Sequence, residues 1–316
     1  MRLIFMGYHN IGHVCLEALI EHCRSFGDEI VAVVTQADDP DENIWFASVR
    51  ELAFAHYLPL YQPRDPNEPA FVEAMAKLAP DFLFSCYYRH MLKEPLLKLP
   101  RLGALNLHGS LLPSYRGRCP VNWVLVHGET ETGVTLHYME EKPDRGDIVA
   151  AKPVPIALTD TALTLFARMT AAAGELMGEI YPLLRAGQAP RLAQDHRQAS
   201  YFGGRRPADG LIDWQKSAWE VYNLVRAVTH PYPGAFTFFK DRKLFIWEGQ
   251  PMKASSSSHG AYPPGRIIGA MPGEGLLVAT AEGHFLIQRA QWEGEPEFLG
   301  PVLATWEQLV AERLGR

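Results

Sequence analysis

This 316-residue sequence has few cysteines, no excess of positive charge and no long apolar run. The four cysteines lack metal-site and redox spacing, so we expect free thiols in a cytoplasmic protein (Cys15, Cys23, Cys86 and Cys119). No apolar run approaches the roughly 20 residues of a membrane-spanning helix, so we expect no membrane insertion. The net charge of −6 disfavours bulk binding to nucleic acid, which needs a basic surface.

A dinucleotide fingerprint is also missing near the start of the chain. The apolar run Leu3–Met6 predicts a buried strand, and a helical pattern separates it from a second strand at Glu29–Thr35. Gly7 and Gly12 follow the first strand without the G-x-G-x-x-G spacing, which disfavours NAD binding. The strand–helix–strand opening itself predicts an α/β domain with a Rossmann-like, doubly wound, mostly parallel sheet.

The strongest positive signal is the stretch from Gly103 to Gly117, which reads G-A-L-N-L-H-G-S-L-L-P-S-Y-R-G. As a strand, Ala104–His108 places Asn106 and His108 on one face and two leucines on the other. Parallel α/β sheets bind ligands where strands end in such loops. A single histidine on a strand more often has a structural role, but two polar residues at i and i+2 must each be paired or contact a ligand. The pattern therefore predicts a site.

The sequence Gly-Gly-Arg-Arg-Pro at 203–207 predicts a domain boundary. We expect a catalytic domain over residues 1–203 and a smaller domain over residues 204–316. Short β-type runs separated by Pro, Gly and Ser predict a small barrel in the second domain. The serines at 255–258 predict a linker, and we expect residues 299–314 to close the chain with a helix.

The stretch opened by Asn106 and His108 resembles the signature of the formyltransferases that use 10-formyltetrahydrofolate. That signature is Asn-x-His followed by S-L-L-P and Y-R-G, with an Asp in a later D-x-G-D-type loop. This sequence has all of it (Asn106, His108, Ser110, Leu111, Leu112, Pro113, Tyr115, Arg116, Gly117 and Asp144). The resemblance implies 10-formyltetrahydrofolate as co-substrate and an OB-like β-barrel as the C-terminal domain. It implies no metal, and the sequence has no His/Cys/carboxylate cluster with metal spacing.

The resemblance also implies roles for a catalytic trio. Asn106 is expected to donate to the oxyanion that forms when an amine attacks the formyl carbon, and His108 to act as general acid toward the folate nitrogen. Asp144 is expected to raise the pKa of His108 and so favour the imidazolium. We interpret His137, on a later predicted strand, as structural. By the same resemblance, the folate site is expected to include His90, Met91, Leu92, Arg118, Glu140, Glu141, Lys142, Pro143 and Asp144.

A closer likeness is to the formyltransferase half of the bifunctional enzymes that modify UDP-4-amino-4-deoxy-L-arabinose. Shared stretches include F-S-x-Y-Y-R-H at 84–90, N-W-V-L-V at 122–126, G-E-T-E-T-G-V-T-L-H at 128–137 and P-G-A-F at 233–236. The likeness implies a nucleotide-linked amino sugar as acceptor, in lipid A modification and resistance to cationic peptides. Those enzymes continue into a decarboxylase domain. We therefore expect a stand-alone version, one domain of a longer protein, or a separate decarboxylase partner.

Three other functions stay open. Methionyl-tRNA formyltransferases share the core but use a basic loop after the second strand and a basic C-terminal domain. Here residues 205–316 hold 12 Lys and Arg against 12 Asp and Glu, which disfavours phosphate contacts. The loop at 36–43 is acidic, with Asp38, Asp39, Asp41 and Glu42. A hydrolase that releases formate and a non-catalytic folate-binding module are the further alternatives, and the complete trio argues against the second.

Overall fold

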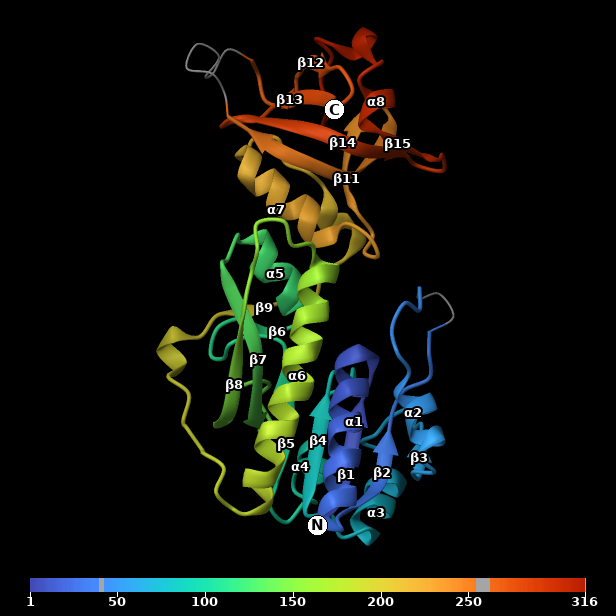
Figure 1. The fold of residues 1–316 in the computed structure, drawn as a ribbon, viewed down its shortest axis with the longest axis vertical. Helices are drawn as coiled ribbons and strands as arrows, with labels where there is room; N and C mark the ends of the chain where they lie inside the picture. Colours follow the sequence, from blue (N-terminus) through green and yellow to red (C-terminus); the bar gives the residue numbers. More distant parts are fainter. Residues whose placement is uncertain (40–42, 254–261, 316) are drawn as a thin grey trace. The chain divides into compact units, whose positions relative to one another are not determined.

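The structure, a computed structural model, describes residues 1–39, 43–253 and 262–315 (Figure 1). Asp41 and Glu42 of the predicted acidic loop, and the predicted linker at 255–258, lie outside the described residues. The chain divides into two compact units. The N-terminal unit comprises Met1–Pro120, Glu131–Ile156 and Phe166–Gly203, and the C-terminal unit comprises Val121–Thr130, Ala157–Leu165 and Gly204–Arg316.

The N-terminal unit is built around a seven-stranded sheet in the order β3-β2-β1-β4-β5-β7-β8. Its strands are β1 (Arg2–Gly7), β2 (Glu29–Val34), β3 (Leu60–Tyr61), β4 (Phe82–Cys86), β5 (Gly103–His108), β7 (Glu131–Tyr138) and β8 (Ile148–Pro155). The first five in spatial order are parallel, whereas β7 is antiparallel to both β5 and β8. A short parallel pair, β6 (Arg116–Gly117) with β9 (Tyr201–Phe202), ties the turn after β5 to the end of the unit.

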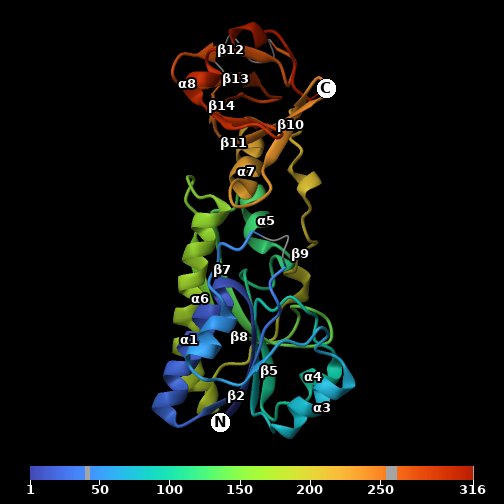
Figure 2. The same cartoon turned by 90° about the vertical axis from the view of Figure 1, so that its right-hand side faces the viewer.

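Helices cover both faces of this sheet, because its central strands are apolar on both sides. The helices of this unit are α1 (His9–Phe26), α2 (Val49–Ala55), α3 (Pro69–Lys77), α4 (Glu94–Leu97) and, from Phe166 on, α6 (Ala162–Arg185), whereas α5 (Pro120–Val126) belongs from Val121 on to the C-terminal unit. Figure 2 shows α1 and α6 on one side of the sheet and α3 and α4 on the other. Met75 of α3 and Leu96 of α4 share a core cluster with Ile4, while the buried Tyr181 ring of α6 lies 6.2 Å from the Phe84 ring. The predicted doubly wound α/β fold is confirmed.

None of the helices in the described ranges is both long and apolar enough to cross a bilayer.

The C-terminal unit is built around an antiparallel sheet in the order β10-β11-β14-β13-β12, with β15 paired to β14. Its strands are β10 (Ala235–Phe239), β11 (Arg242–Met252), β12 (Ile267–Met271), β13 (Gly275–Ala279), β14 (His284–Trp292) and β15 (Glu297–Leu299). Helix α7 (Ala218–Val228) begins with a capping box, in which Ser217 Oγ accepts from Glu220 N and the Glu220 carboxylate accepts from Ser217 N. The predicted β-rich character of this part of the chain is therefore present.

The closing helix predicted over residues 299–314 is wrong. The structure has a short helix, α8 (Gly300–Leu303), and a single 3-10 turn at Glu307–Leu309. The Trp306 ring stacks on Trp292 at 5.7 Å, and the backbone N–H groups of Ala311 and Leu314 donate to the carbonyls of Ile267 and Gly265. These tertiary contacts around β12 outweigh the weak intrinsic preference for a continuous helix.

Candidate active site

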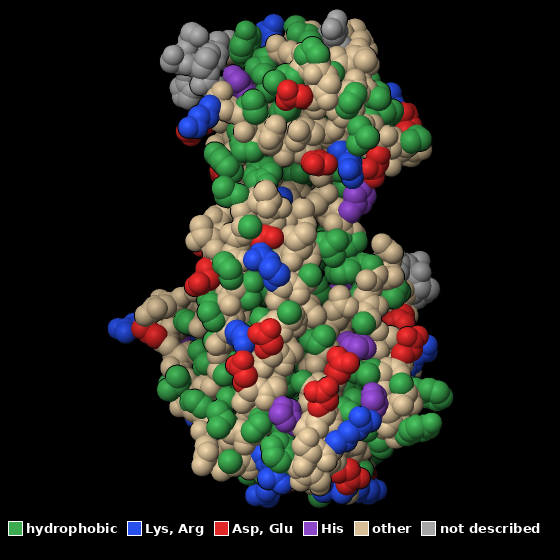
Figure 3. Space-filling view, in the orientation of Figure 1, with side chains coloured by type: hydrophobic (Ala, Val, Ile, Leu, Met, Phe, Trp, Pro, Cys, Tyr) green, Lys and Arg blue, Asp and Glu red, His purple; other side chains and the backbone are tan. Residues whose placement is uncertain are grey.

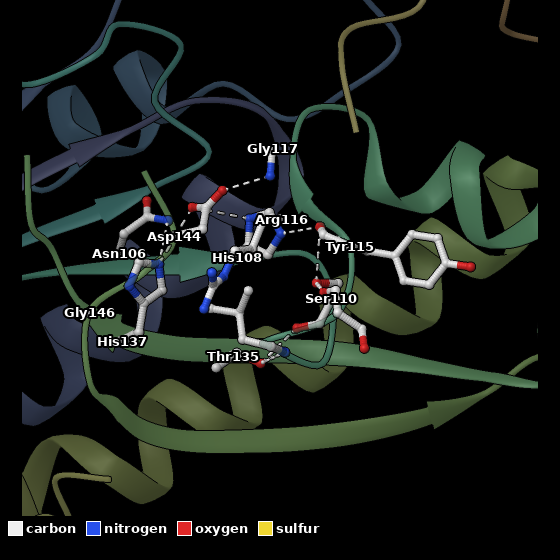
Figure 4. Close-up of polar contacts among 12 residues, drawn as sticks. Asn106, His108, Ser110, Tyr115, Arg116, Gly117, Thr135, His137, Asp144 and Gly146 are labelled. Atoms are coloured by element: carbon white, nitrogen blue, oxygen red, sulfur yellow. Dashed lines mark hydrogen bonds and ion pairs between the residues drawn. The ribbon is translucent and has the colours of Figure 1, made fainter. Parts of the chain in front are cut away.

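Strands β5 and β7 bring four polar side chains together in the N-terminal unit. In their antiparallel register Asn106 lies opposite His137, and His108 lies opposite Thr135. Residues directly opposite each other in such a pair project from the same face of the sheet. Figure 4 shows Asn106, His108 and His137 turned toward the side chain of Asp144, so the structure assembles the predicted trio.

His108 is buried, with 6% of its surface exposed, and both ring nitrogens face acceptors. Nε2 donates to the carbonyl of Tyr115 at 2.8 Å, and Nδ1 lies 3.6 Å from Oδ1 of Asp144. Burial lowers the pKa of His108 below its ordinary value, while the Asp144 carboxylate and the Tyr115 carbonyl oppose that shift. The Asp144 carboxylate therefore acts on this pKa in the predicted direction, but desolvation outweighs it, so the net shift is downward.

Asp144 lies in the loop between β7 and β8, and its two carboxylate oxygens have different partners. Oδ1 faces the rings of His108 and His137 at 3.6 and 3.7 Å, and Oδ2 accepts from the backbone N of Gly117 at 2.8 Å. Burial by itself raises the pKa of this carboxyl, but the two imidazoles and the Gly117 N–H lower it to about 2. Asp144 is therefore ionised at neutral pH.

His137 is the member of this cluster to which the sequence pattern gives a structural role. It is 1% exposed, and its Nδ1 donates to the carbonyl of Tyr138 at 2.8 Å. In that tautomer Nε2 is an acceptor, and it receives the amide Nδ2 of Asn106 at 3.2 Å. The ring thus fixes the orientation of Asn106. A signal was present: Thr135 and His137 are polar residues at i and i+2 in an apolar strand, the same pattern as Asn106 and His108.

The turn after β5 is closed by hydroxyl groups. Ser110 Oγ donates to the carbonyl of Ser114 at 2.6 Å, and Thr135 Oγ1 donates to the carbonyl of Ser110 at 2.6 Å. The turn ends at Gly117, which has φ +98°, and a Cβ there would lie 2.1 Å from the carbonyl oxygen of Phe202. Only glycine fits at the position whose N–H reaches Asp144.

The residues expected at a folate site lie on loops next to this cluster. His90, Met91 and Leu92 follow β4, whose carboxyl end lies beside that of β5. The Met91 side chain is 60% exposed, and its carbonyl accepts from Asn67 Nδ2. The others flank the two loops that meet at Asp144: exposed Arg118 directly follows Gly117, while exposed Glu140, Glu141 and Lys142 and half-buried Pro143 directly precede Asp144.

Within the described residues, no group of three or more His, Cys, Asp or Glu side chains could hold a metal ion.

Residues 1–180 match the family described as formyl transferase, and residues 205–301 match the formyl transferase C-terminal domain. The chain belongs to the formyl transferase family. The prediction of an enzyme, a formyltransferase, is confirmed by this membership.

Solved structures of other formyltransferases share the fold. The N-formyltransferase from Helicobacter canadensis, in complex with folinic acid and dTDP-3-aminofucose, is 19% identical with a TM-score of 0.69, covering 94% of this chain and 99% of that one. WlaRD, a sugar 3N-formyl transferase, is 17% identical with a TM-score of 0.66, again over 94% and 99% of the two chains.

A third similar structure has a different name. HypX from Aquifex aeolicus, in complex with tetrahydrofolic acid, is 17% identical with a TM-score of 0.62, covering 95% of this chain and 46% of that one. At these identities the likeness establishes the shared fold alone.

Proposed function

We propose that this formyltransferase moves a formyl group from 10-formyltetrahydrofolate to the amine of a nucleotide-linked amino sugar. The observation that carries the proposal is the assembly of an amide donor, an imidazole and an ionised carboxylate: Asn106 and His108 on β5, and Asp144 in the loop between β7 and β8. Residues 1–203 are proposed to hold the chemistry. His90–Leu92, Arg118 and the loop from Glu140 to Asp144 are proposed to contact the folate.

The proposed reaction needs one donor to the oxyanion and one proton for the leaving nitrogen. The acceptor amine attacks the formyl carbon and becomes an ammonium, the bond from that carbon to folate N10 breaks as N10 takes up a proton from His108, and the ammonium then returns one proton to the imidazole. Asn106 Nδ2 carries two hydrogens, so one can point to His137 while the other stabilises the oxyanion. His108 supplies the proton to N10, and its hydrogen bond to the Tyr115 carbonyl is exchanged as the folate binds.

Charge supports a sugar acceptor over a tRNA. Residues 205–316 carry equal numbers of acidic and basic side chains, and on the face in Figure 3 the two kinds are interspersed. Neutralising phosphates drives nucleic-acid binding, so a tRNA would require a basic surface. Two of the structures with the same fold contain dTDP or a dTDP-linked amino sugar together with a formyl folate. UDP-4-amino-4-deoxy-L-arabinose is our first choice of acceptor, on the sequence stretches shared with the enzymes that act on it.

The test is formyl transfer from 10-formyltetrahydrofolate in four parallel reactions. They contain UDP-4-amino-4-deoxy-L-arabinose, dTDP-3-aminofucose, charged initiator methionyl-tRNA, or no amine. Turnover with a sugar alone supports the proposal, and the preferred nucleotide identifies the acceptor class. Turnover with the tRNA alone overturns the sugar assignment. Release of formate without any amine identifies a hydrolase instead.

A further inference from the structure

The loop that carries Asp144 forms neither helix nor strand, so contacts from elsewhere in the chain must fix its geometry. Asp144 itself has a left-handed backbone, with φ +58°. That conformation is sterically disfavoured for a non-glycine residue and persists only when its surroundings hold it. The hydrogen bond from Gly117 N fixes one carboxylate oxygen but does not hold the loop backbone.

The side chain of Gln194 holds this backbone from the other side. Its Nε2 donates to the carbonyl of Asp144 at 3.0 Å and to the carbonyl of Gly146 at 2.6 Å. A primary amide has two N–H groups, so each carbonyl receives one. Gln194 is 8% exposed. A buried amide whose hydrogen-bond partners are all in place is held in one orientation.

The oxygen of the same amide faces the turn after β5. Nη2 of Arg116, a buried side chain, donates to Gln194 Oε1. The two residues next to Arg116 in the chain contact His108 and Asp144. The Tyr115 carbonyl accepts from His108, and Gly117 N donates to Asp144. Gln194 therefore connects the loop of Asp144 to the turn that touches His108.

The backbone beside Gln194 is itself anchored. Leu192 exchanges both of its backbone hydrogen bonds with Ile148, the first residue of β8, at 2.8 and 2.9 Å. The amide is thus presented from a fixed point two residues away, at the end of the same loop that it clamps.

We propose that Gln194 is a positioning residue, which sets the distance between the Asp144 carboxylate and His108 by clamping two carbonyls of the loop. The role needs the two N–H donors and not only the size of the side chain. A glutamate there would still accept from Arg116 but would present lone pairs to the carbonyls of Asp144 and Gly146. The proposal rests on the proposed formyl transfer for its kinetic consequence only.

Two variants and one matched control test it. Gln194→Met keeps the approximate volume and removes every hydrogen bond, while Gln194→Glu keeps the acceptor for Arg116 and removes the donors. Gln198→Met is the control, because Gln198 is exposed in the same segment and bonds only locally, to Asp195. The measurements are kcat, KM for the formyl donor, the pH profile of kcat/KM, the melting temperature, and the ring-nitrogen NMR shifts of His108 in the free enzyme.

For both Gln194 variants we expect kcat to fall about 10- to 100-fold, the loss that follows a misplacement of about 1 Å. The KM for the formyl donor should change little. The alkaline limb of kcat/KM should move to lower pH, because a displaced carboxylate no longer raises the pKa of His108. The His108 ring shifts should change in the free enzyme, and Gln198→Met should match the wild type in every measurement.

Three results would overturn the proposal. The first is a lower melting temperature of the Gln194 variants with unchanged kcat, pH profile and His108 shifts, which would indicate a purely structural role. The second is wild-type behaviour of Gln194→Glu beside a damaged Gln194→Met, which assigns the role to Arg116 alone. The third is wild-type behaviour of both variants. If the wild type transfers formyl to no amine, the proposed function fails, but the His108 shifts still decide whether Gln194 positions the pair.

Discussion

Each unit of the molecule contains a carboxylate beside an imidazole, and the two pairs differ in their surroundings. In the N-terminal unit His108 Nδ1 lies 3.6 Å from Asp144, with side chains 7% and 11% exposed. In the C-terminal unit His230 Nε2 lies 2.8 Å from Glu297, with side chains 48% and 34% exposed. We expect removal of the carboxylate to matter less in the closer pair than in the buried one. Water and salt screen the exposed charges, whereas the buried charges act on one another with little screening.

Both members of the buried pair have shifted pKa values. Asp144 has a pKa of about 2, and burial holds the pKa of His108 below its ordinary value. At neutral pH the resting pair is therefore a carboxylate beside a mostly neutral imidazole. Any change that alters this balance should alter catalysis, whereas the same change in the exposed pair should not.

Replacing His108 with alanine should have the largest effect. Loss of the proposed general acid is expected to lower kcat by about 10² to 10⁴, the usual contribution of one positioned acid. The fold should survive, since the side chain leaves a small polar cavity lined by Asp144 and the Tyr115 carbonyl. Single-turnover transfer and circular dichroism measure the two properties. A rate close to that of the wild type would remove His108 from the mechanism.

Asp144→Asn should have the next largest effect, and its sign follows from charge. The carboxylate raises the pKa of His108 against burial, and the amide cannot, so this pKa should fall further. The imidazolium then becomes scarcer at a given pH, and the alkaline limb of the kcat/KM profile moves to lower pH. A shift of one unit corresponds to about tenfold in rate at fixed pH. Profiles of wild type and variant with one acceptor decide it, because the amine titrates identically in both. An unmoved limb would contradict the prediction.

The sequence could predict the part of this site that is local in the chain. Alternation placed Asn106 and His108 on one face, and the resemblance supplied Asp144. It could not predict that burial would outweigh the carboxylate in setting the pKa of His108, because desolvation depends on packing from several elements. The position of His137 depends on the register of β5 against β7, which a single strand does not encode.

The fold, like the site, could be predicted only where the signals are local in the chain. Apolar runs and glycine turns predicted the doubly wound sheet, because those signals act over a few residues. The helix predicted over 299–314 is wrong because Trp306 and Ala311 find partners in β14 and β12, which are distant in the chain. The sequence does not indicate the role of Gln194 for a related reason. Its partners, Arg116, Asp144 and Gly146, contact it only in the folded protein.

The half-buried imidazole of His9 has no carboxylate among the groups that shift its pKa. Burial and the nearby Arg89 lower its pKa from 6.5 to about 3. Between those values the unfolded chain binds a proton that the folded chain does not. The free energy of unfolding should therefore fall on acidification from pH 6.5 toward pH 3, by at most about 1.4 kcal/mol per unit from this residue.

His9→Asn should flatten that dependence. Asparagine tolerates the backbone φ of +64° at this position, although the stack on Phe46 is lost. Denaturant unfolding at pH 7.5 and pH 5 measures the slope separately from the overall stability. Equal slopes for variant and wild type would show that His9 is not the source.

Glu297→Gln should have the smallest effect and is the counterpart of Asp144→Asn. Both replace a carboxylate beside an imidazole by the amide of the same shape, but Glu297 and His230 are partly solvated. An exposed ion pair contributes roughly 0–1 kcal/mol, because solvent screening offsets most of its attraction. The His230 ring also stacks on Trp247 at 3.8 Å, a contact that this substitution leaves in place. We therefore expect a change in unfolding free energy below about 1 kcal/mol and wild-type kcat across the pH range. A kinetic effect as large as that of Asp144→Asn would mean that burial does not separate the two pairs, and that the C-terminal unit takes part in the chemistry.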